Sequence, residues 1–183
     1  MLIVGLGNPG EKYSKTRHNA GAMLLEYLRK NWNFPDFKFD KYTEALISKN
    51  NVSSPADSVI LSFPQTFMNE SGKSVSNIME KENISLEQLL VLHDDKDFSF
   101  GEIKLQKDIS SAGHKGVQSI IDTIGTNSFW RLRIGIGPVP VPLPTEEFVL
   151  QDFIFPEEYT ELRLKIFQEA ELKIKPLLQE NEK

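Results

Sequence analysis

Short, continuous apolar runs alternate with segments of helical periodicity along this chain, and no other feature limits the fold as much. Leu2–Leu6, Val59–Phe63 and Leu89–Leu92 are each typical of a strand that is buried on both faces. Between these runs, apolar residues recur at helical spacing through 20–28 and 75–79. The alternation predicts an α/β fold in which a mixed, mostly parallel central sheet is flanked by helices.

The remaining elements follow from weaker patterns. Glu102–Lys107 alternates like a half-exposed strand, and Leu132–Ile136 is typical of a further strand. A helix is expected between them from about Val117, with Gly125 as its C-terminal stop. A strand is also expected near Tyr42–Ile47.

The C-terminal part combines a proline-rich segment with a long helical pattern. The four prolines between 138 and 144 predict a stiff, extended surface segment. A helix is expected at about 157–178, stopped or kinked near Pro176. At 183 residues, the whole chain, 1–183, is expected to form a single domain.

Composition excludes several kinds of protein and site. The chain has no cysteine, which rules out disulfides, thiolate zinc sites and a cysteine nucleophile. Apolar residues make up 39% and charged residues 26%, as in soluble globular proteins, and no apolar run reaches the roughly 20 residues of a membrane span. The N-terminus lacks the basic region and the cleavage site of a secretory signal. We therefore expect a cytoplasmic protein without membrane contact.

The formal net charge of −5 weighs against a polyanionic partner, but the charges are unevenly distributed. Acidic residues crowd the C-terminal segment, and basic residues recur upstream of it, at Lys104, Lys107, Lys115, Arg131 and Arg133. A basic face on an acidic protein therefore remains open, beside the alternative of a mixed, solvated surface.

Residues 5–10, GLGNPG, match the dinucleotide-binding fingerprint G-x-G-x-x-G directly after a strand. That fingerprint requires a helix to begin at once, so that its N-terminus holds the pyrophosphate. Here residues 11–17 are polar and aperiodic, and the apolar helix starts only near Ala20, with Asn19 as a suitable N-cap. The glycines are better explained by a turn that brings Asn8 close to a ligand.

The chain has three histidines, His18, His93 and His114, each at a predicted junction between a loop and a helix or strand. His18 directly precedes a helix N-terminus, whose positive end disfavours the imidazolium and keeps the ring available as a general base. An aspartate at the other ring nitrogen would fix the tautomer, and Asp94, expected at the end of a buried strand, is suitably placed.

Two other uses of these residues have less support. Three histidines and several aspartates leave a zinc site open, but neither H-E-x-x-H nor H-x₃₋₅-H spacing occurs. A serine nucleophile lacks the G-x-S-x-G turn. A water molecule activated by His18 is the simplest nucleophile, and no metal is expected.

Asn8 and Asn69 lie in predicted loops, in the segments GNPG and FMNESGK. An asparagine side chain offers one acceptor and two donors, which suits holding a peptide backbone or polarising a carbonyl. A turn-forming role is the alternative, and for Asn8, before Pro9-Gly10, it is equally well supported.

Taken together, these motifs resemble the bacterial-type peptidyl-tRNA hydrolases. The similarity extends over residues 1 to roughly 155 and rests on blocks that occur in the same order: LIVGLGNPG at 2–10 with Tyr13, TRHNAG at 16–21, TFMN at 66–69, His93-Asp94 with Asp97, Gly113-His114 with Gly116, and RLRIGIG at 131–137. Each block alone is modest evidence, but their shared order is highly specific.

The resemblance implies hydrolysis of the ester that joins a peptide to the 3′ ribose of tRNA, by a monomer that needs neither metal nor organic cofactor. His18 would be the base that acts on water, and Asp94 would keep it basic. Asn8 would recognise the blocked amino group. Tyr13, Phe67, Asn69 and His114 would bind the peptide and the tRNA 3′ end. Lys115 could bind a phosphate or the ester carbonyl at the same place.

The basic residues then acquire an expected role at the tRNA acceptor arm. Lys104, Lys107, Arg131 and Arg133 could contact phosphates, and such contacts would be salt-sensitive. The N-terminus of the helix after Gly113 could bind a phosphate through its backbone amides.

One position departs from the family. The family pattern around His114 is GGHNG, whereas this chain has AGHKG at 112–116. Lys115 therefore replaces an asparagine, and lysine has three donors, a positive charge and no acceptor. A nearby cation also lowers the pKa of a histidine. This departure favours the main alternative, a non-catalytic RNA-binding member of the same superfamily, but His18, Asp94, Asn8 and Asn69 are all present.

Overall fold

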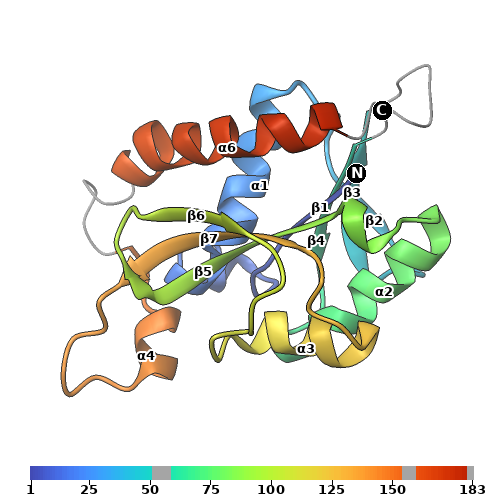
Figure 1. Ribbon diagram of the computed structural model, residues 1–183. Coiled ribbons are helices and arrows are strands. Elements are labelled where there is room, and N and C mark those ends of the chain that lie inside the picture. Colours follow the sequence, from blue (N-terminus) through green and yellow to red (C-terminus); the bar gives the residue numbers. More distant parts are fainter. Residues whose placement is uncertain (51–58, 154–159, 181–183) are drawn as a thin grey trace.

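The computed structural model describes residues 1–50, 59–153 and 160–180, and its seven strands form one sheet in the order β2-β3-β4-β1-β5-β7-β6 (Figure 1). The three apolar runs lie side by side and parallel at its centre, as β4 (Ile60–Pro64), β1 (Leu2–Gly5) and β5 (Leu89–Ser99). Their apolar side chains are buried on both faces of the sheet. The predicted α/β class is confirmed.

The outer strands make the sheet mixed. β7 (Trp130–Gly137) continues the parallel order next to β5, and β6 (Ile103–Gln106) closes that edge antiparallel to β7. At the opposite edge, β3 (Ala45–Lys49) and β2 (Lys38–Asp40) are antiparallel. The strand expected near Tyr42–Ile47 begins only at Ala45, because residues 41–44 form a turn.

β5 is longer than its apolar run predicts. The sequence indicates a strand that ends near Leu92, but β5 continues to Ser99 because β7 pairs with it as far as Ser99 and Gly137. His93 and Asp94 therefore lie inside a strand, not at its end. This setting restricts the backbone on both sides of Asp94 and buries it.

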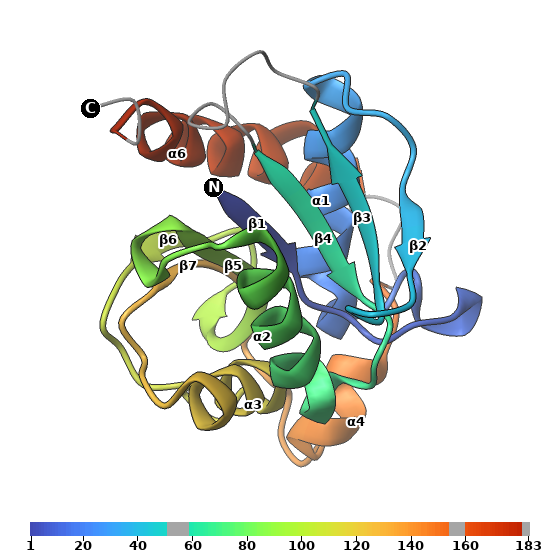
Figure 2. The same ribbon diagram turned by 90° about the vertical axis from the view of Figure 1, so that its right-hand side faces the viewer.

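Helices cover both faces of the sheet (Figure 2). On one face, α1 (Ala20–Asn31) and α6 (Phe167–Glu180) pack through Leu24, Leu28, Ala170 and Ile174. On the other face lie α2 (Ser71–Glu82) and α3 (Lys115–Ile124), whose buried residues include Val75, Ile78, Val117 and Ile120. Gly125 ends α3 with a φ of 80°, as its position after the apolar repeat predicts.

Short helices fill the connections. In the part of the chain that the structure describes, the 3₁₀ helices are η1 (Glu11–Tyr13), η2 (Arg17–Asn19), η4 (Met68–Glu70) and η5 (Leu86–Gln88). The sequence does not predict α4 (Thr145–Leu150), which follows the proline-rich segment. That segment is also not extended throughout, because residues 141 and 142 form a turn.

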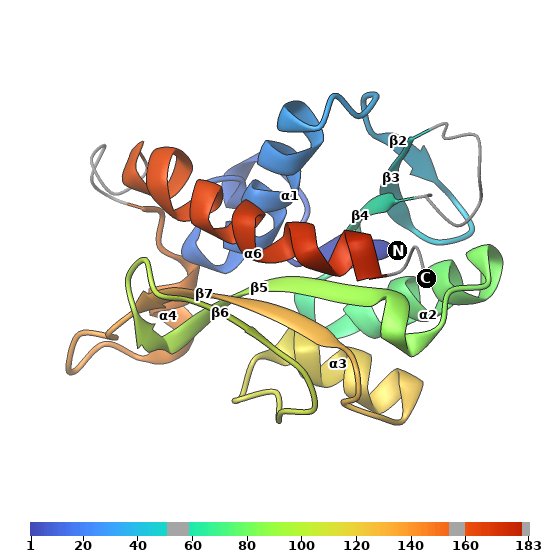
Figure 3. The same ribbon diagram turned by 45° about the horizontal axis from the view of Figure 1, so that its top comes forward.

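The C-terminal helix crosses over one face of the sheet (Figure 3). The start expected at about 157 lies outside the described residues, and a π-helical stretch, η6 (Leu162–Ile166), precedes α6. Of the two outcomes expected at Pro176, a stop or a kink, the stop is wrong, since α6 runs through this proline to Glu180. Proline removes one backbone hydrogen bond, but buried Ile174 and Leu177 pack the helix against the core on either side. Within the three described stretches of chain, no helix has the length and apolarity needed to span a membrane.

Candidate active site

A cavity of about 500 Å³ lies beside the carboxyl ends of β1 and β4 and residues 94–96 of β5, near the usual position for a ligand in an open α/β sheet. It gathers seven of the residues singled out from the sequence: Asn8, His18, Phe67, Asn69, Asp94, His114 and Lys115. The remaining lining residues are neighbours of these in the chain and four residues of α4, Thr145, Glu146, Val149 and Leu150. Segments far apart in the sequence thus share one site.

Close contact between α1 and β5 brings His18 to Asp94. Gly21, in the first turn of α1, lies so near β5 that a methyl group there would be 2.1 Å from the carbonyl oxygen of Leu92. A glycine at this position therefore lets the helix approach the strand, and η2 then holds His18 over it. The His18 residue is only 8% exposed.

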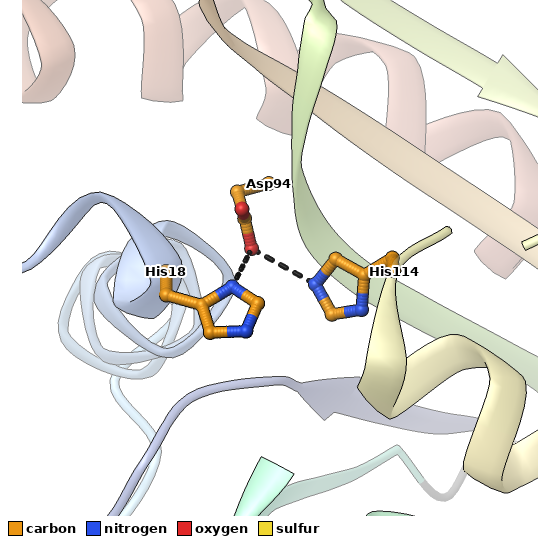
Figure 4. Close-up of side chains that lie close together, drawn as sticks. All are labelled: His18, Asp94 and His114. Carbon is orange, nitrogen blue, oxygen red and sulfur yellow. Dashed lines mark hydrogen bonds and ion pairs between the residues drawn. The ribbon is translucent and has the colours of Figure 1, made fainter. Parts of the chain in front are cut away.

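Two histidines donate to one oxygen of Asp94 (Figure 4). His18 Nδ1 and His114 Nε2 each lie 2.9 Å from Asp94 Oδ1. Burial by itself would raise the pKa of Asp94, but attraction to His18 and His114, together with their hydrogen bonds, holds that pKa well below its usual range. Asp94 is therefore an ionised acceptor shared by two rings.

These contacts determine which ring nitrogen of His18 carries the proton. Ionised Asp94 can only accept, so His18 Nδ1 carries the hydrogen and donates it. Nε2 of the neutral ring is then unprotonated, which is the state that a general base requires. The prediction that Asp94 fixes the tautomer of His18 agrees with this geometry.

The pKa of His18 moves in the opposite direction from the one expected from its helix. Burial lowers it, but the charge and hydrogen bond of Asp94 raise it by more, and nearby Lys115 lowers it only slightly. The net pKa is raised. The contact with Asp94, which the sequence analysis already pairs with His18, therefore accounts for the direction of this pKa.

Asn8 is held rigidly at the cavity wall. Its side-chain Oδ1 accepts from the backbone N–H of Met68 at 3.0 Å. Its backbone N–H and carbonyl bond to Oδ1 and Nδ2 of Asn19, at 2.9 and 3.0 Å. Asn19 is the N-cap residue of α1, as expected, but its side chain makes no capping bond because its amide is used in this way. Asn8 therefore presents only its NH₂ group as a donor.

Lys115, which replaces the asparagine of the family pattern, also lines the cavity. Lys115 Nζ lies 2.6 Å from Oε1 of Glu146, which joins the start of α3 to α4 beside the cavity. Both side chains are largely exposed to solvent. Phe67, with an exposed ring, and Asn69 complete the lining from the segment around η4.

Two of the four basic residues expected to contact phosphates do not have that role. Arg131 is fully buried and donates to the backbone carbonyls of Ile109 and Ser110. Arg133 forms an ion pair with buried Asp95 and bonds Gln106 Oε1. Both lie on β7, which is paired on both sides, and a buried arginine there must find partners within the protein.

The other expected contacts have mixed outcomes. Lys104 and Lys107 keep their ammonium groups near the rings of Phe98 and Trp130, away from the cavity lining. Tyr13, expected in the cleft, lies on η1 outside the lining residues. The N-terminus of α3 is capped by its own residue, since His114 Nδ1 accepts from the backbone N–H of Val117, so a phosphate there would compete with this cap.

His18, Asp94 and His114 also satisfy the basic requirement for a metal site, because their donor atoms lie within 4.8 Å of one another. The two contacts of 2.9 Å, however, have the length of hydrogen bonds, with the protons of both rings directed at Asp94. A metal would have to displace both protons. The chemistry of this donor set therefore suits proton transfer better than metal binding.

Sequence reasoning missed two parts of the site. α4 supplies one wall, and the signal that could have revealed it is Pro144 followed by acidic residues at 146 and 147, a typical helix start. The contact of His114 with Asp94 carries no local signal, because 20 positions separate the two residues in the chain.

Comparison with known proteins adds independent evidence. A family model described as peptidyl-tRNA hydrolase matches residues 2–183. The chain is 41% identical over 154 residues to a peptidyl-tRNA hydrolase of Mycoplasma mycoides, covering 83% of this chain and 80% of the relative. It is 43% identical over 157 residues to one of Aquifex aeolicus, covering 86% and 79%.

Solved structures agree with the sequence comparison. The crystal structure of peptidyl-tRNA hydrolase from Acinetobacter baumannii superposes with a TM-score of 0.86 at 36% identity. The match covers 97% of this chain and 88% of that chain. The similarity thus extends over nearly the whole fold.

Proposed function

The chain belongs to the peptidyl-tRNA hydrolase family, and we propose that it carries out the family's reaction with His18 as the general base and water as the nucleophile. The reaction is hydrolysis of the ester between peptide and tRNA, which returns tRNA to translation. The observation that carries the assignment to His18 is its contact with ionised Asp94, which leaves Nε2 unprotonated beside the cavity. A non-catalytic RNA-binding role would not need this pair.

Each proton has a place in the proposed reaction. His18 Nε2 takes a proton from water as the water oxygen bonds to the ester carbonyl carbon. Asp94 stabilises the resulting imidazolium through Nδ1–H. The bond to the ribose oxygen then breaks, and that oxygen receives the proton from Nε2. The products are a peptide acid and a tRNA with a free hydroxyl, and His18 is neutral again.

Asn8 is proposed to distinguish peptidyl-tRNA from aminoacyl-tRNA. Because Met68 occupies its Oδ1, only NH₂ donors remain for a ligand. A peptide linkage next to the ester offers a carbonyl oxygen to such a donor. The free ammonium of an aminoacyl-tRNA offers only donors and would leave the Asn8 amide without a partner.

The rest of the cavity is proposed to bind the two arms of the substrate. The exposed ring of Phe67 can stack on a base of the tRNA 3′ end, and Asn69 can hydrogen-bond the peptide backbone. Lys115 adds a positive charge at the same wall. Lys104 and Lys107 remain proposed phosphate contacts of the acceptor arm.

The enzyme is further proposed to act as a monomer in the cytoplasm, where peptidyl-tRNA arises, and without a metal. The hydrogen-bonded arrangement of His18, Asp94 and His114 supports a metal-free reaction. Sedimentation of the purified protein with deacylated tRNA tests the oligomeric state. If the enzyme is a monomer, the mass of the complex will correspond to one chain and one tRNA.

Hydrolysis of an N-acetylated aminoacyl-tRNA tests the function itself. Purified protein should release the acyl amino acid without added metal and at the same rate in the presence of a chelator. The unacetylated aminoacyl-tRNA serves as the matched control and should be cleaved far more slowly. An inactive protein would refute the function, and loss of activity with chelator would refute the metal-free reaction.

A further inference from the structure

His114 has no ring nitrogen left for a substrate. Its Nδ1 accepts the backbone N–H of Val117 at 3.2 Å, as the N-cap of α3. Its Nε2 lies 2.9 Å from Asp94 Oδ1, and this ionised oxygen can only accept. Both contacts require the neutral tautomer with the proton on Nε2. The side chain is also only 7% exposed.

The ring of His114 packs against two other histidine rings. Its centroid lies 4.8 Å from that of His18 and 4.8 Å from that of His93. His93 is itself fixed, because its Nδ1–H donates to the backbone carbonyl of Asp94 at 2.7 Å. Burial lowers the pKa of His93, and it stays neutral. These ring contacts and the two hydrogen bonds leave the His114 side chain little freedom to rotate toward a ligand.

We propose that His114 is a positioning residue, which fixes the Asp94 carboxylate and limits how strongly that carboxylate stabilises the His18 imidazolium. The reason is that both rings use the same oxygen atom. A carboxylate oxygen that already accepts one hydrogen bond has less negative charge to offer a second donor. His114 thereby keeps His18 from becoming too strong a base, which would hold it protonated near neutral pH.

A test of this proposal requires that the other charged groups around His18 and Asp94 keep their contacts. The titratable and charged groups that lie around this pair are His93, Arg131, the Asp95–Arg133 pair, the Lys115–Glu146 pair and Lys96, which pairs with Asp97. None of these donates to an Asp94 side-chain oxygen among the described residues, so a substitution at position 114 isolates the shared contact.

Two substitutions separate the two contacts of His114. In His114→Asn, Oδ1 branches from Cγ as Nδ1 does, so the variant retains an acceptor for Val117 N–H and loses the donor to Asp94. In His114→Gln, the amide nitrogen lies one bond further out, as Nε2 does, so the variant retains the donor and loses the cap. Thermal unfolding of both variants establishes that each is folded.

The pH dependence of kcat/KM, which reports the free enzyme, is the readout. In His114→Asn, Asp94 accepts a hydrogen bond from His18 alone and stabilises its imidazolium more strongly. The acidic limb should therefore move up by about one pH unit. The KM and the affinity for deacylated tRNA should not change. In His114→Gln, the limb should stay at its wild-type position. An unmoved limb with a raised KM in His114→Asn would make His114 a substrate contact, and equal shifts in both variants would exclude the donor as the cause.

The inference rests on His18 acting as the base, and a substrate-free measurement separates the two claims. NMR titration of the imidazole signals follows the His18 pKa directly, and His18→Asn assigns the resonance among only three histidines. The pKa should rise by about one unit in His114→Asn. An unchanged pKa would refute the inference even in an active enzyme. A raised pKa in an inactive protein would support it and refute only the proposed reaction.

Discussion

The ionisation of His18 links the structure of the site to its working pH. Burial lowers its pKa, and contact with Asp94 raises it by more. His18 must be neutral to accept a proton from water, so activity is lost as the pH falls through the raised pKa. The acidic limb of kcat/KM should therefore lie above the ordinary histidine value of about 6.5. A limb well below that value would mean that Asp94 does not act on His18 as described.

Some residues of the site could be predicted from the sequence, and the contacts of others could not. Asn8 and Asp94 could be predicted because they follow apolar runs that lead to one edge of the sheet, and His18 because it directly precedes a helix. The burial of Arg131 could not, because an arginine in an alternating strand has the pattern of a surface charge, and its carbonyl partners lie on a loop more than 20 positions away. The contact of His114 with Asp94 likewise depends on tertiary structure alone.

At the scale of elements, the approach of α1 to β5 holds the base against its partner. In Gly21→Ala, the new methyl group would lie 2.1 Å from Leu92 O, so the helix must move. We expect a loss of about 2–3 kcal/mol in the free energy of unfolding, together with a loss of turnover. Chemical denaturation and the hydrolysis assay measure the two effects.

Ala22→Gly, one position further along α1, is the matched control. It removes a methyl group and introduces no clash, so it should cost about 1 kcal/mol of helix stability and leave turnover intact. Equal effects of the two variants would show that the helix–strand approach does not position His18.

The ion pair between α3 and α4 is exposed, and such pairs contribute little to stability, about 0–1 kcal/mol. Replacing Lys115 with the asparagine of the family pattern should therefore leave turnover intact or raise it. Glu146→Gln, which removes the partner charge and keeps Lys115, is the control and should also remain active. A collapse of turnover in Lys115→Asn alone would show that the lysine has acquired a necessary role in this chain.

The helices and strands differ in how well local sequence patterns predict them. The central strands are continuous apolar runs, and α3 has an apolar repeat with a glycine stop, so both were predictable. α4 has only six residues and follows four prolines, which indicate extended chain. The extension of β5 past its apolar run depends on pairing with β7, a partner that no local pattern identifies.

For the whole molecule, the net charge of −5 opposes binding to tRNA, and local basic groups must overcome it. We expect kcat/KM for peptidyl-tRNA to fall with rising salt, with a log–log slope set by the number of phosphate contacts. Lys104→Ala and Lys107→Ala should each reduce that slope by about 0.7–0.9. Unchanged slopes in both variants would place the acceptor arm on another face.

The central claim is that His18 is the catalytic base and not a structural or binding residue. The most direct measurement compares wild type and His18→Ala in single-turnover hydrolysis of N-acetylated aminoacyl-tRNA and in binding of deacylated tRNA. Turnover should fall by about 10³-fold or more, while the dissociation constant for tRNA stays unchanged. A parallel loss of binding and turnover, or turnover close to wild type, would contradict the account.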